Sequence, residues 1–368
     1  KDLLIHETHL SNLTLVQTNI SSSRIKGGVE YLFINEDLSG KLIIPEKKNK
    51  KISLKLDYIT INMAVDETKD SFLSLFNSIG ESFDFSTQAF FINGIDYGEW
   101  EFSVLPKANE LIINDIKGAY GKWGVKSDKE GISSLKIVKK SFGWTSSLQT
   151  NIYSGSPEKA FIQIGIEPNF EMDILNVDTN IKWNNLPWLF DFSSITGDIS
   201  LNLYGLTIQN SENLDRTNNL LRLVNIFNIT DSIEKVTNLD FRKLYKRGFN
   251  TDRVTGTFHI NNGGVTIKEP ILLTSGSSKF SWNGAISRNK KGELTELDLE
   301  VIMTLPLREY LPAYALILGG PITAGVVYIA GKAFEKNLDQ LSSGKWKING
   351  NIAEPKTEFK GWFEDRKK

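Results

Sequence analysis

The sequence has no cysteine among its 368 residues and only three histidines. A disulfide framework, a cysteine-based zinc site and a cysteine nucleophile are therefore excluded. The formal net charge is -1 and no large basic block is present, so composition does not support nucleic-acid binding through phosphate neutralisation. No G-x-S-x-G, Walker or G-x-G-x-x-G motif occurs. The sequence therefore lacks the residues and motifs of several common classes of catalytic site.

The composition permits a folded interior, because 40% of the residues are hydrophobic and 24% are charged. The chain starts KDLLIHETHL, without an initiator methionine or a basic-then-apolar signal segment. We expect it to be a fragment whose targeting region is missing.

Apolar residues alternate with polar ones through most of the first 110 residues, as in half-buried strands. One series is Ile52, Leu54, Leu56 and Tyr58, and the opposite parity then continues with Ile59, Ile61 and Met63. A switch of this kind predicts a bulge that moves the apolar set to the opposite face. The lysines of 47–51 predict a solvated hairpin tip.

Short strands separated by turns are predicted over 89–204, and no strand–helix–strand rhythm of an α/β fold appears. In Ile162, Ile164 and Ile166 one face is apolar, which is typical of antiparallel strands with one buried face. The predicted strands are Ala89–Ile92, Trp100–Val104, Glu110–Ile113, Ser134–Val138, Phe161–Ile166, Asp173–Trp183 and Asp198–Tyr204.

Helical spacing appears in two places, Ser71–Gly80 and Ser211–Gly248. The second predicts a helix over Leu220–Phe227 and another that begins at Asp231. Strands return after it, with a turn at Asn261–Gly264 between them. The predicted strands are Val254–Ile260, Val265–Ile267, Lys279–Ile286, Leu294–Leu305 and a final one around Trp346–Ile352.

The stretch Tyr310–Gly331 contains no Asp, Glu, Lys or Arg. As one helix at ~1.5 Å per residue it would extend about 33 Å, the thickness of a bilayer's hydrocarbon core. Pro312 and Pro321, with several glycines, interrupt that helix. Three alternatives stay open: a helix packed on the sheet of its own domain, a helix at a membrane surface, and a true span.

Candidate catalytic and metal-binding positions are weak. The run His6-Glu7-Thr8-His9 lacks the i, i+4 histidine spacing of a zinc protease and predicts a surface or strand role. His259 lies in a predicted strand with no second ligand at a suitable spacing, which favours a structural role. No two Asp or Glu residues have a spacing that indicates a catalytic pair, so we predict no catalytic site, no metal and no cofactor. The eight tryptophans favour core packing.

An ordered set of short pieces carries a resemblance to a known family. The pieces are Trp183–Pro187, Ile195–Asp198, Leu239–Phe241, Lys246-x-Gly248-Phe249, Gly256-x-Phe258, Gly263–Val265, Leu305-Pro306, Leu311-Pro312, Gly319–Pro321, Gly325, Lys332, Leu338–Leu341, Ile348-x-Gly350 and Pro355. From about Met172 to Pro355 the chain resembles the end of the AsmA-like YhdP proteins of Gram-negative bacteria. Residues 1–170 resemble them only in strand rhythm. Ile352 and Gln340 depart from the family pattern.

The resemblance implies a protein that spans the periplasm and is anchored in the inner membrane by an N-terminal helix absent from this sequence. It implies a long, curved, open β-sheet with an apolar concave face. It further implies phospholipid carriage between the inner and outer membranes, with this fragment at the end nearest the outer membrane.

We therefore predict a mainly β fold: an elongated, curved antiparallel sheet forming an open apolar groove, with a helical insertion and an apolar C-terminal helix. The segments are a β-rich groove (1–209), a helical insertion (210–248), further groove strands (249–309), an apolar helical segment (310–342), and a final strand with a tail (343–368).

The predicted function is non-enzymatic phospholipid transport, with phospholipid, the outer-membrane surface and a possible envelope protein as partners, and no nucleic acid. The groove-facing residues would be Ile52, Leu54, Leu56, Leu297, Leu299, Val301 and Met303; alternatively, these pack beneath the predicted helices. Membrane-contacting residues would be Leu311, Tyr314, Leu316, Ile317, Leu318, Val326, Val327 and Ile329. The alternative function is a structural or assembly protein of the envelope that binds partners through its sheet edge. A glycan hydrolase would need a carboxylate pair across a cleft.

Overall fold

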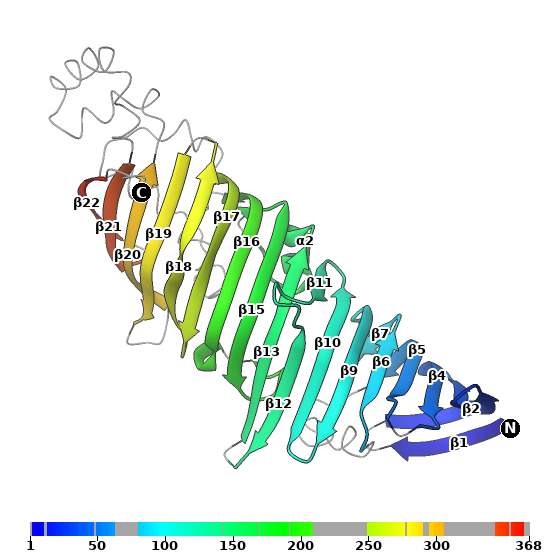
Figure 1. The fold of residues 1–368 in the computed structure, drawn as a ribbon. Helices are drawn as coiled ribbons and strands as arrows, with labels where there is room; N and C mark the ends of the chain where they lie inside the picture. Colours follow the sequence, from blue (N-terminus) through cyan, green and yellow to red (C-terminus); the bar gives the residue numbers. More distant parts are fainter. Residues whose placement is uncertain are drawn as a thin grey trace, which may run out of the picture. The chain divides into compact units, whose positions relative to one another are not determined.

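Figure 1 shows the fold of the chain as a computed structural model. It describes residues 2–10, 13–47, 49–62, 80–141, 143–168, 170–190, 192–208, 249–276, 278–289, 294–304, 343–352 and 355–363. These residues form mostly β-strands, as the sequence predicted. The chain divides into two compact units: unit 1 comprises Lys1–Ser154 and Asp178–Ile195, and unit 2 comprises Gly155–Val177 and Thr196–Lys368.

Unit 1 is built from strands that mostly pair with their neighbours in sequence. Pairing runs in the order β1-β2-β3-β4-β5-β6-β9-β10-β12-β13. The short strands β7 and β8 extend from β5, and β11 joins β10 and β13. The bounds are β1 (Asp2–Leu10), β2 (Leu13–Ile25), β3 (Gly28–Ile34), β4 (Leu38–Pro45), β5 (Ile52–Ile61), β6 (Phe83–Thr87), β7 (Phe90–Ile92), β8 (Ile95–Asp96), β9 (Glu99–Lys107), β10 (Glu110–Tyr120), β11 (Trp123–Lys126), β12 (Ser134–Lys140) and β13 (Gly143–Ser154).

Two pairings in unit 1 depart from the predicted antiparallel arrangement. β5 pairs in parallel with β6 and with β7. A parallel neighbour requires a crossover connection of a dozen or more residues, which a hairpin turn cannot provide. The connection from β5 to β6 contains 63–79, which lies outside the described residues together with almost all of the predicted helix Ser71–Gly80.

The predicted bulge in β5 is confirmed. Ser39 of β4 faces Tyr58 and the next residue, Gly40, faces Leu56, so Asp57 is the extra residue. The prediction that the bulge moves the apolar set to the opposite face is wrong. Leu38 faces Ile59, so Leu56 and Ile59 lie on the same face, because the extra residue cancels the change of parity.

The hairpin tip between β4 and β5 is also confirmed. Lys47, Lys50 and Lys51 are exposed there, and the Lys50 amide donates to the Lys47 carbonyl over 3.0 Å. Charged side chains at this position stay hydrated while the two strands pair.

Unit 2 contains a run of antiparallel strands in which sequence neighbours pair, except that β14 pairs with β16. The order is β14-β16-β17-β18-β19-β20-β21-β22. The bounds are β14 (Phe170–Glu171), β16 (Thr196–Ile208), β17 (Phe249–Asn261), β18 (Gly264–Ser275), β19 (Ser278–Arg288), β20 (Leu294–Thr304), β21 (Ser343–Asn351) and β22 (Lys356–Phe363). β15 (Ile174–Asn184) contains the boundary between the units, and a 3₁₀ turn, η1, covers Phe192–Ser194.

The predicted turn between β17 and β18 is confirmed. Asn262 and Gly263 both have positive φ, 47° and 75°, which suits the tight turn of a two-residue hairpin. β22 follows Pro355, where the sequence suggested only a tail.

The predicted strand Phe161–Ile166 is wrong. Residues Pro157–Gln163 form the helix α2, with Pro157 in its first turn. Proline suits that position because its fixed φ matches the helix and its missing N–H has no partner there anyway. Ala160 is buried against the unit, whereas Ile162 and Ile164 are exposed. The period-two isoleucines therefore do not mark a buried strand face.

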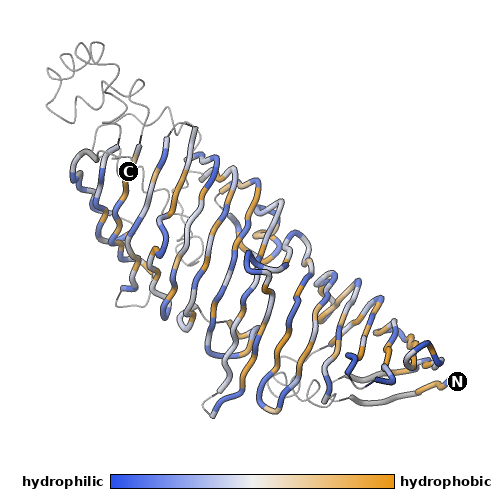
Figure 2. Tube along the Cα trace, in the orientation of Figure 1, coloured by the Kyte–Doolittle hydropathy of each residue, from blue (hydrophilic) through white to orange (hydrophobic). Residues whose placement is uncertain are grey.

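Hydropathy alternates along many of the strands, so that orange and blue segments follow one another (Figure 2). β20 is the longest clear case, with Leu297, Leu299, Val301 and Met303 buried on one face. Successive side chains of a strand point to opposite faces, so each such strand has one apolar face. The helices predicted over 211–248 and Tyr310–Gly331 lie outside the described residues.

Candidate functional site

Unit 1 has an apolar sheet face with a packed cluster at one part of it. Phe83, Val104, Leu111 and Ile137 are buried together, and Leu186 from the segment after β15 packs on them. Ile52 lies against this cluster, and the Phe85 and Phe102 rings stack at 4.6 Å between centroids. Register places Leu54 opposite Phe85 on the same face. The cluster therefore acts as the hydrophobic core of unit 1.

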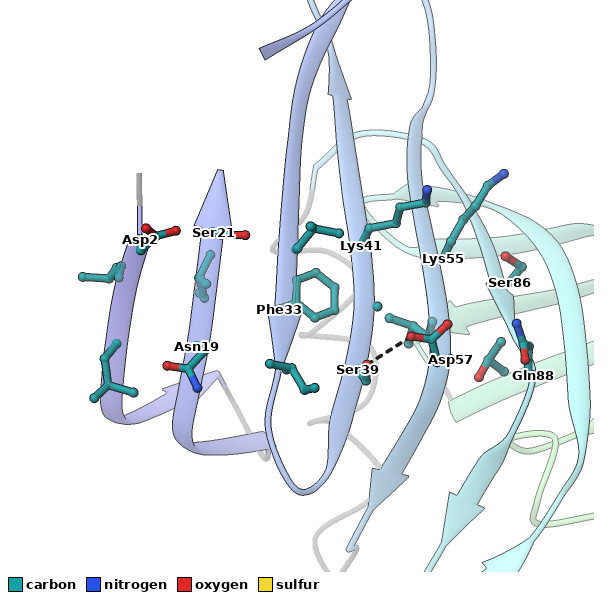
Figure 3. Close-up of a pocket in the computed structure, with 18 residues that line it drawn as sticks. Asp2, Asn19, Ser21, Phe33, Ser39, Lys41, Lys55, Asp57, Ser86 and Gln88 are labelled. Atoms are coloured by element: carbon teal, nitrogen blue, oxygen red, sulfur yellow. Dashed lines mark hydrogen bonds between the residues drawn. The ribbon is translucent and has the colours of Figure 1, made fainter. Parts of the chain in front are cut away.

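A cavity of about 1090 Å³ crosses β1–β6 of the same unit (Figure 3). Its lining follows three adjacent rows that run across the strands. The middle row consists of Leu3, Ile20, Phe33, Gly40, Leu56 and Thr87. The first flanking row, which contains both lysines, consists of Asp2, Ser21, Leu32, Lys41, Lys55 and Ser86. The second flanking row consists of Leu4, Asn19, Ile34, Ser39, Asp57 and Gln88.

The middle row belongs to the apolar face. Leu56 stands opposite Gly40 and shares its face with Leu54 and Ile52. The flanking rows therefore lie on the opposite face and carry most of the polar groups. In one of them Ser39 Oγ donates to Asp57 Oδ2 over 3.1 Å at the bulge. The cavity thus combines apolar and charged lining.

Gly40 has no room for a side chain at this site. A Cβ at position 40 would lie 2.7 Å from the Leu56 Cα and would also overlap the Lys55 carbonyl oxygen. Its φ of 151° further disfavours other residues. Only glycine therefore fits between Phe33 and Leu56 in the middle row, and no side chain fills the space at that position.

Lys41 and Lys55 stand directly opposite each other in the β4–β5 pair. Lys41 Nζ lies 3.6 Å from Glu30 Oε2. Sequence reasoning missed this pair, although a signal existed. In a hairpin whose tip lies near residue 48, positions 41 and 55 are equally far from the tip and must face each other.

Unit 2 has its own apolar face, built from rows that cross β16–β21. One row joins Leu203, Val254, Leu273, Phe280 and Met303, and the next joins Trp282, Val301 and Trp346. The predicted groove residues Leu297, Leu299, Val301 and Met303 all belong to this face and are buried. Trp282 and Trp346 are fully buried beside them, in agreement with the core-packing prediction, whereas Trp188 is 43% exposed and departs from it.

The sequence left two alternatives for the predicted groove residues, lipid contact or packing in the core. Ile52 and Leu54 are half-buried and Leu56 is buried in unit 1, while the four residues of β20 are buried in unit 2. Both alternatives stay predictions. The predicted membrane-contacting residues, from Leu311 to Ile329, lie outside the described residues.

His259, for which the sequence predicts a structural role, contacts an acidic residue on the neighbouring strand that the sequence spacing did not indicate. Its Nδ1 lies 2.7 Å from Asp198 Oδ1, and Lys268 Nζ donates to Asp198 Oδ2 over 2.6 Å. Partial burial is the largest influence on Asp198 and favours the neutral acid. The hydrogen bonds from Lys268 and His259 nevertheless outweigh it and lower the pKa of the carboxyl. The same contact raises the pKa of Lys268.

The described residues contain no group of three or more His, Asp or Glu side chains that could hold a metal ion. The backbone of His6–His9 lies in β1. Within the part of the chain that the structure covers, no helix has the length and apolar character needed to cross a membrane. The site is therefore described by its apolar faces and by the cavity across β1–β6.

Comparisons with known proteins identify one protein family. A family model described as "YhdP protein" matches residues 2–357. The chain is also similar to the intermembrane phospholipid transporter YhdP of Escherichia coli (strain K12), with 22% identity over 191 residues. That alignment covers 52% of this chain but only 14% of the relative's length. No solved structure matches the chain.

Proposed function

The chain belongs to the YhdP protein family, and from that premise we propose that it carries phospholipid between the membranes of a cell envelope. Its apolar sheet surface would hold acyl chains, and no covalent chemistry would be needed. The relative's name describes intermembrane phospholipid transport, which supports this assignment. We place the protein in the periplasm for the same reason.

The observation that carries the proposal is the cavity across β1–β6, whose lining includes apolar side chains on both faces of the strands, Phe33 and Leu56 in the middle row and Leu32 and Ile34 in the flanking rows. An acyl chain requires a continuous dry surface and no specific hydrogen bonds, and a row of alternate strand residues supplies such a surface. Each buried CH₂ group contributes about 0.8 kcal/mol, so a chain of ~16 carbons gains on the order of 10 kcal/mol.

Transport also requires that the lipid can leave its site. A surface that binds every position of an acyl chain in the same way permits sliding but sets no direction, because equal affinity shifts no equilibrium. Direction would come from a gradient or from a partner. We propose that the segment 310–331, through the residues from Leu311 to Ile329, contacts the outer membrane, and that an N-terminal helix beyond this sequence anchors the protein in the inner membrane.

The test is native mass spectrometry with lipid extraction on the purified chain. Phospholipid should co-purify with the wild type at a stoichiometry of about one or more. Phe33→Asp and Ile34→Asp place a charge in the middle row and in a flanking row, on opposite faces of β3. At least one of these variants should lose lipid while circular dichroism stays unchanged.

Ile95→Asp is the matched control, because Ile95 is 51% exposed, close to the 55% of Ile34, and lies outside the cavity. This variant should keep its lipid. A wild-type chain that is stable and free of lipid after purification from membranes would overturn the proposal.

Strands that have only one pairing partner support a second candidate function. Among the described strands, β1 pairs only with β2 and β22 only with β21. Such edges can accept a strand from another protein. The lipid-free outcome above would favour this structural role, and proline substitutions along β22 should then abolish partner binding.

A further inference from the structure

Lys41 and Lys55 form an unusual pair on β4 and β5. They are directly opposite in register, so their side chains leave the same face of the sheet at neighbouring positions. Both line the cavity across β1–β6 (Figure 3). Like charges placed opposite each other destabilise an antiparallel pair unless an anion offsets them. The pair therefore requires a partner or costs stability.

The protein's own acidic groups offset this charge only in part. Glu30 lies 3.6 Å from Lys41, whereas Lys55 has no ion pair in the part of the chain that the structure describes. Asp57, the nearest acidic residue along β5, accepts a hydrogen bond from Ser39 instead. The remaining acidic residue of the lining, Asp2, belongs to β1 at the far side of the cavity.

Other strand pairs match charges of opposite sign. Glu101 of β9 stands opposite Lys117 of β10. In unit 2, Glu300 of β20 stands opposite Lys347 of β21. Opposite charges contribute a small stabilisation in such positions. Lys41 and Lys55, which both line the cavity, are an exception to this pairing of opposite charges.

We propose that Lys41 and Lys55 together bind the phosphate diester of a phospholipid whose acyl chain packs on the exposed apolar side chains that line the cavity on the same face, Leu32 and Ile34. The inference rests on the function proposed above and adds its headgroup specificity. Lysine ammonium groups are compact cations that bind phosphate oxygens by charge-assisted hydrogen bonds. The Ser21 and Ser86 hydroxyls, in the same row as the lysines, supply further donors. The site selects phospholipid over a neutral lipid with the same acyl chains.

The experiment compares two ligands that differ only in the headgroup. The full chain is incubated with dipalmitoyl phosphatidylglycerol or with dipalmitoylglycerol in the same detergent, and bound lipid is counted by native mass spectrometry. The wild type should prefer the phosphate-bearing lipid on the order of tenfold, because a charge-assisted hydrogen bond contributes roughly that factor. The double variant Lys41→Gln/Lys55→Gln should lose the preference and bind dipalmitoylglycerol as before.

Two further variants separate charge from shape. Lys117→Gln removes one positive charge from the same transverse row but outside the cavity, so it should keep the preference. Lys41→Arg/Lys55→Arg retains both charges and should also keep it. Unchanged circular dichroism establishes that each variant is folded.

Each outcome decides a different claim. Equal binding of the two lipids by the wild type, or a preference that survives the double glutamine variant, overturns the headgroup site and leaves the acyl-chain proposal standing. Binding of neither lipid overturns the proposed function and this inference with it. Displacement of bound phosphatidylglycerol by an equal concentration of inorganic phosphate would assign the lysines to free phosphate instead.

Discussion

The indole ring of Trp346 lies over Gly344, two residues earlier on β21, in the space that a side chain at position 344 would fill. Both residues are on the apolar face of unit 2, and Trp346 is fully buried. A ring fills the space beside a glycine in unit 1 too, but across strands: the ring of Trp100 on β9 occupies the place of a side chain at Gly118, its partner on β10. Glycine here makes room for a large ring on a crowded sheet face.

Gly344→Ala should destabilise the protein by about 1–3 kcal/mol, because a buried ring must leave its position to admit the methyl group. The urea midpoint of unfolding, followed by tryptophan fluorescence, measures this loss. Gly155→Ala is the control, since a Cβ at position 155 meets nothing within 4 Å. Equal midpoints for the two variants would show that Trp346 moves aside freely.

The ion pair of Asp198 with Lys268 predicts a specific pH dependence. The pKa of Asp198 is lowered, so its contribution to stability is fully present above about pH 4 and is lost as the pH falls through the lowered folded value. The pKa of Lys268 is raised, so its contribution is fully present below about pH 10.4 and is lost as the pH rises through the raised value.

Asp198→Asn should therefore lower the melting temperature slightly near neutral pH, as expected for a partly exposed pair. The difference from the wild type should shrink as the pH falls below about 4, where the wild-type carboxylate also becomes neutral. Melting curves across this range measure it. A constant difference at all pH values would contradict the linkage.

Deleting Asp57 should disrupt the second half of β5. Without the extra residue, Ile59 and Ile61 would turn to the face opposite Leu56, and the parallel pairing of Ile59 with Phe90 would be lost. Hydrogen exchange of the amides in β7 should become much faster. Asp57→Ala keeps the residue count and removes only the bond to Ser39, so it should leave β7 protected. Protection of β7 in both variants would show that the bulge is dispensable.

The helix α2 predicts opposite outcomes at two positions close in sequence. Ile162 is 55% exposed, so Ile162→Lys should change the free energy of unfolding by less than about 0.5 kcal/mol. Ala160 is fully buried, so Ala160→Asp should cost several times more. Urea unfolding of both variants provides the comparison. A large loss at Ile162 would instead support the strand that the sequence suggested.

Several features of the fold could be predicted from local sequence. The hairpin tip near Lys47, the turn at Asn262-Gly263 and the alternation in β20 each depend on residues close together in the chain. Such features carry their own signal, because turn chemistry and period-two patterning need no distant partner.

Other features depend on partners that the pattern does not name. The period-two isoleucines at 162, 164 and 166 resemble a strand, yet Pro157 begins a helix and leaves Ile162 exposed. The parallel pairing of β5 with β6 follows from a crossover, which periodicity does not encode. The apolar residues of the candidate site could be predicted, whereas the opposition of Lys41 and Lys55 required the register of the hairpin.

The antiparallel neighbours β16 and β17 remain paired although the segment 209–248 separates them in sequence, and β20 and β21 remain paired across 305–342. For a flexible connection, each doubling of length costs only about 0.6 kcal/mol in closure entropy. The lengths of these two connections can therefore change over evolution with little penalty to the strand ladder. The strand ladder therefore tolerates insertions at these two positions.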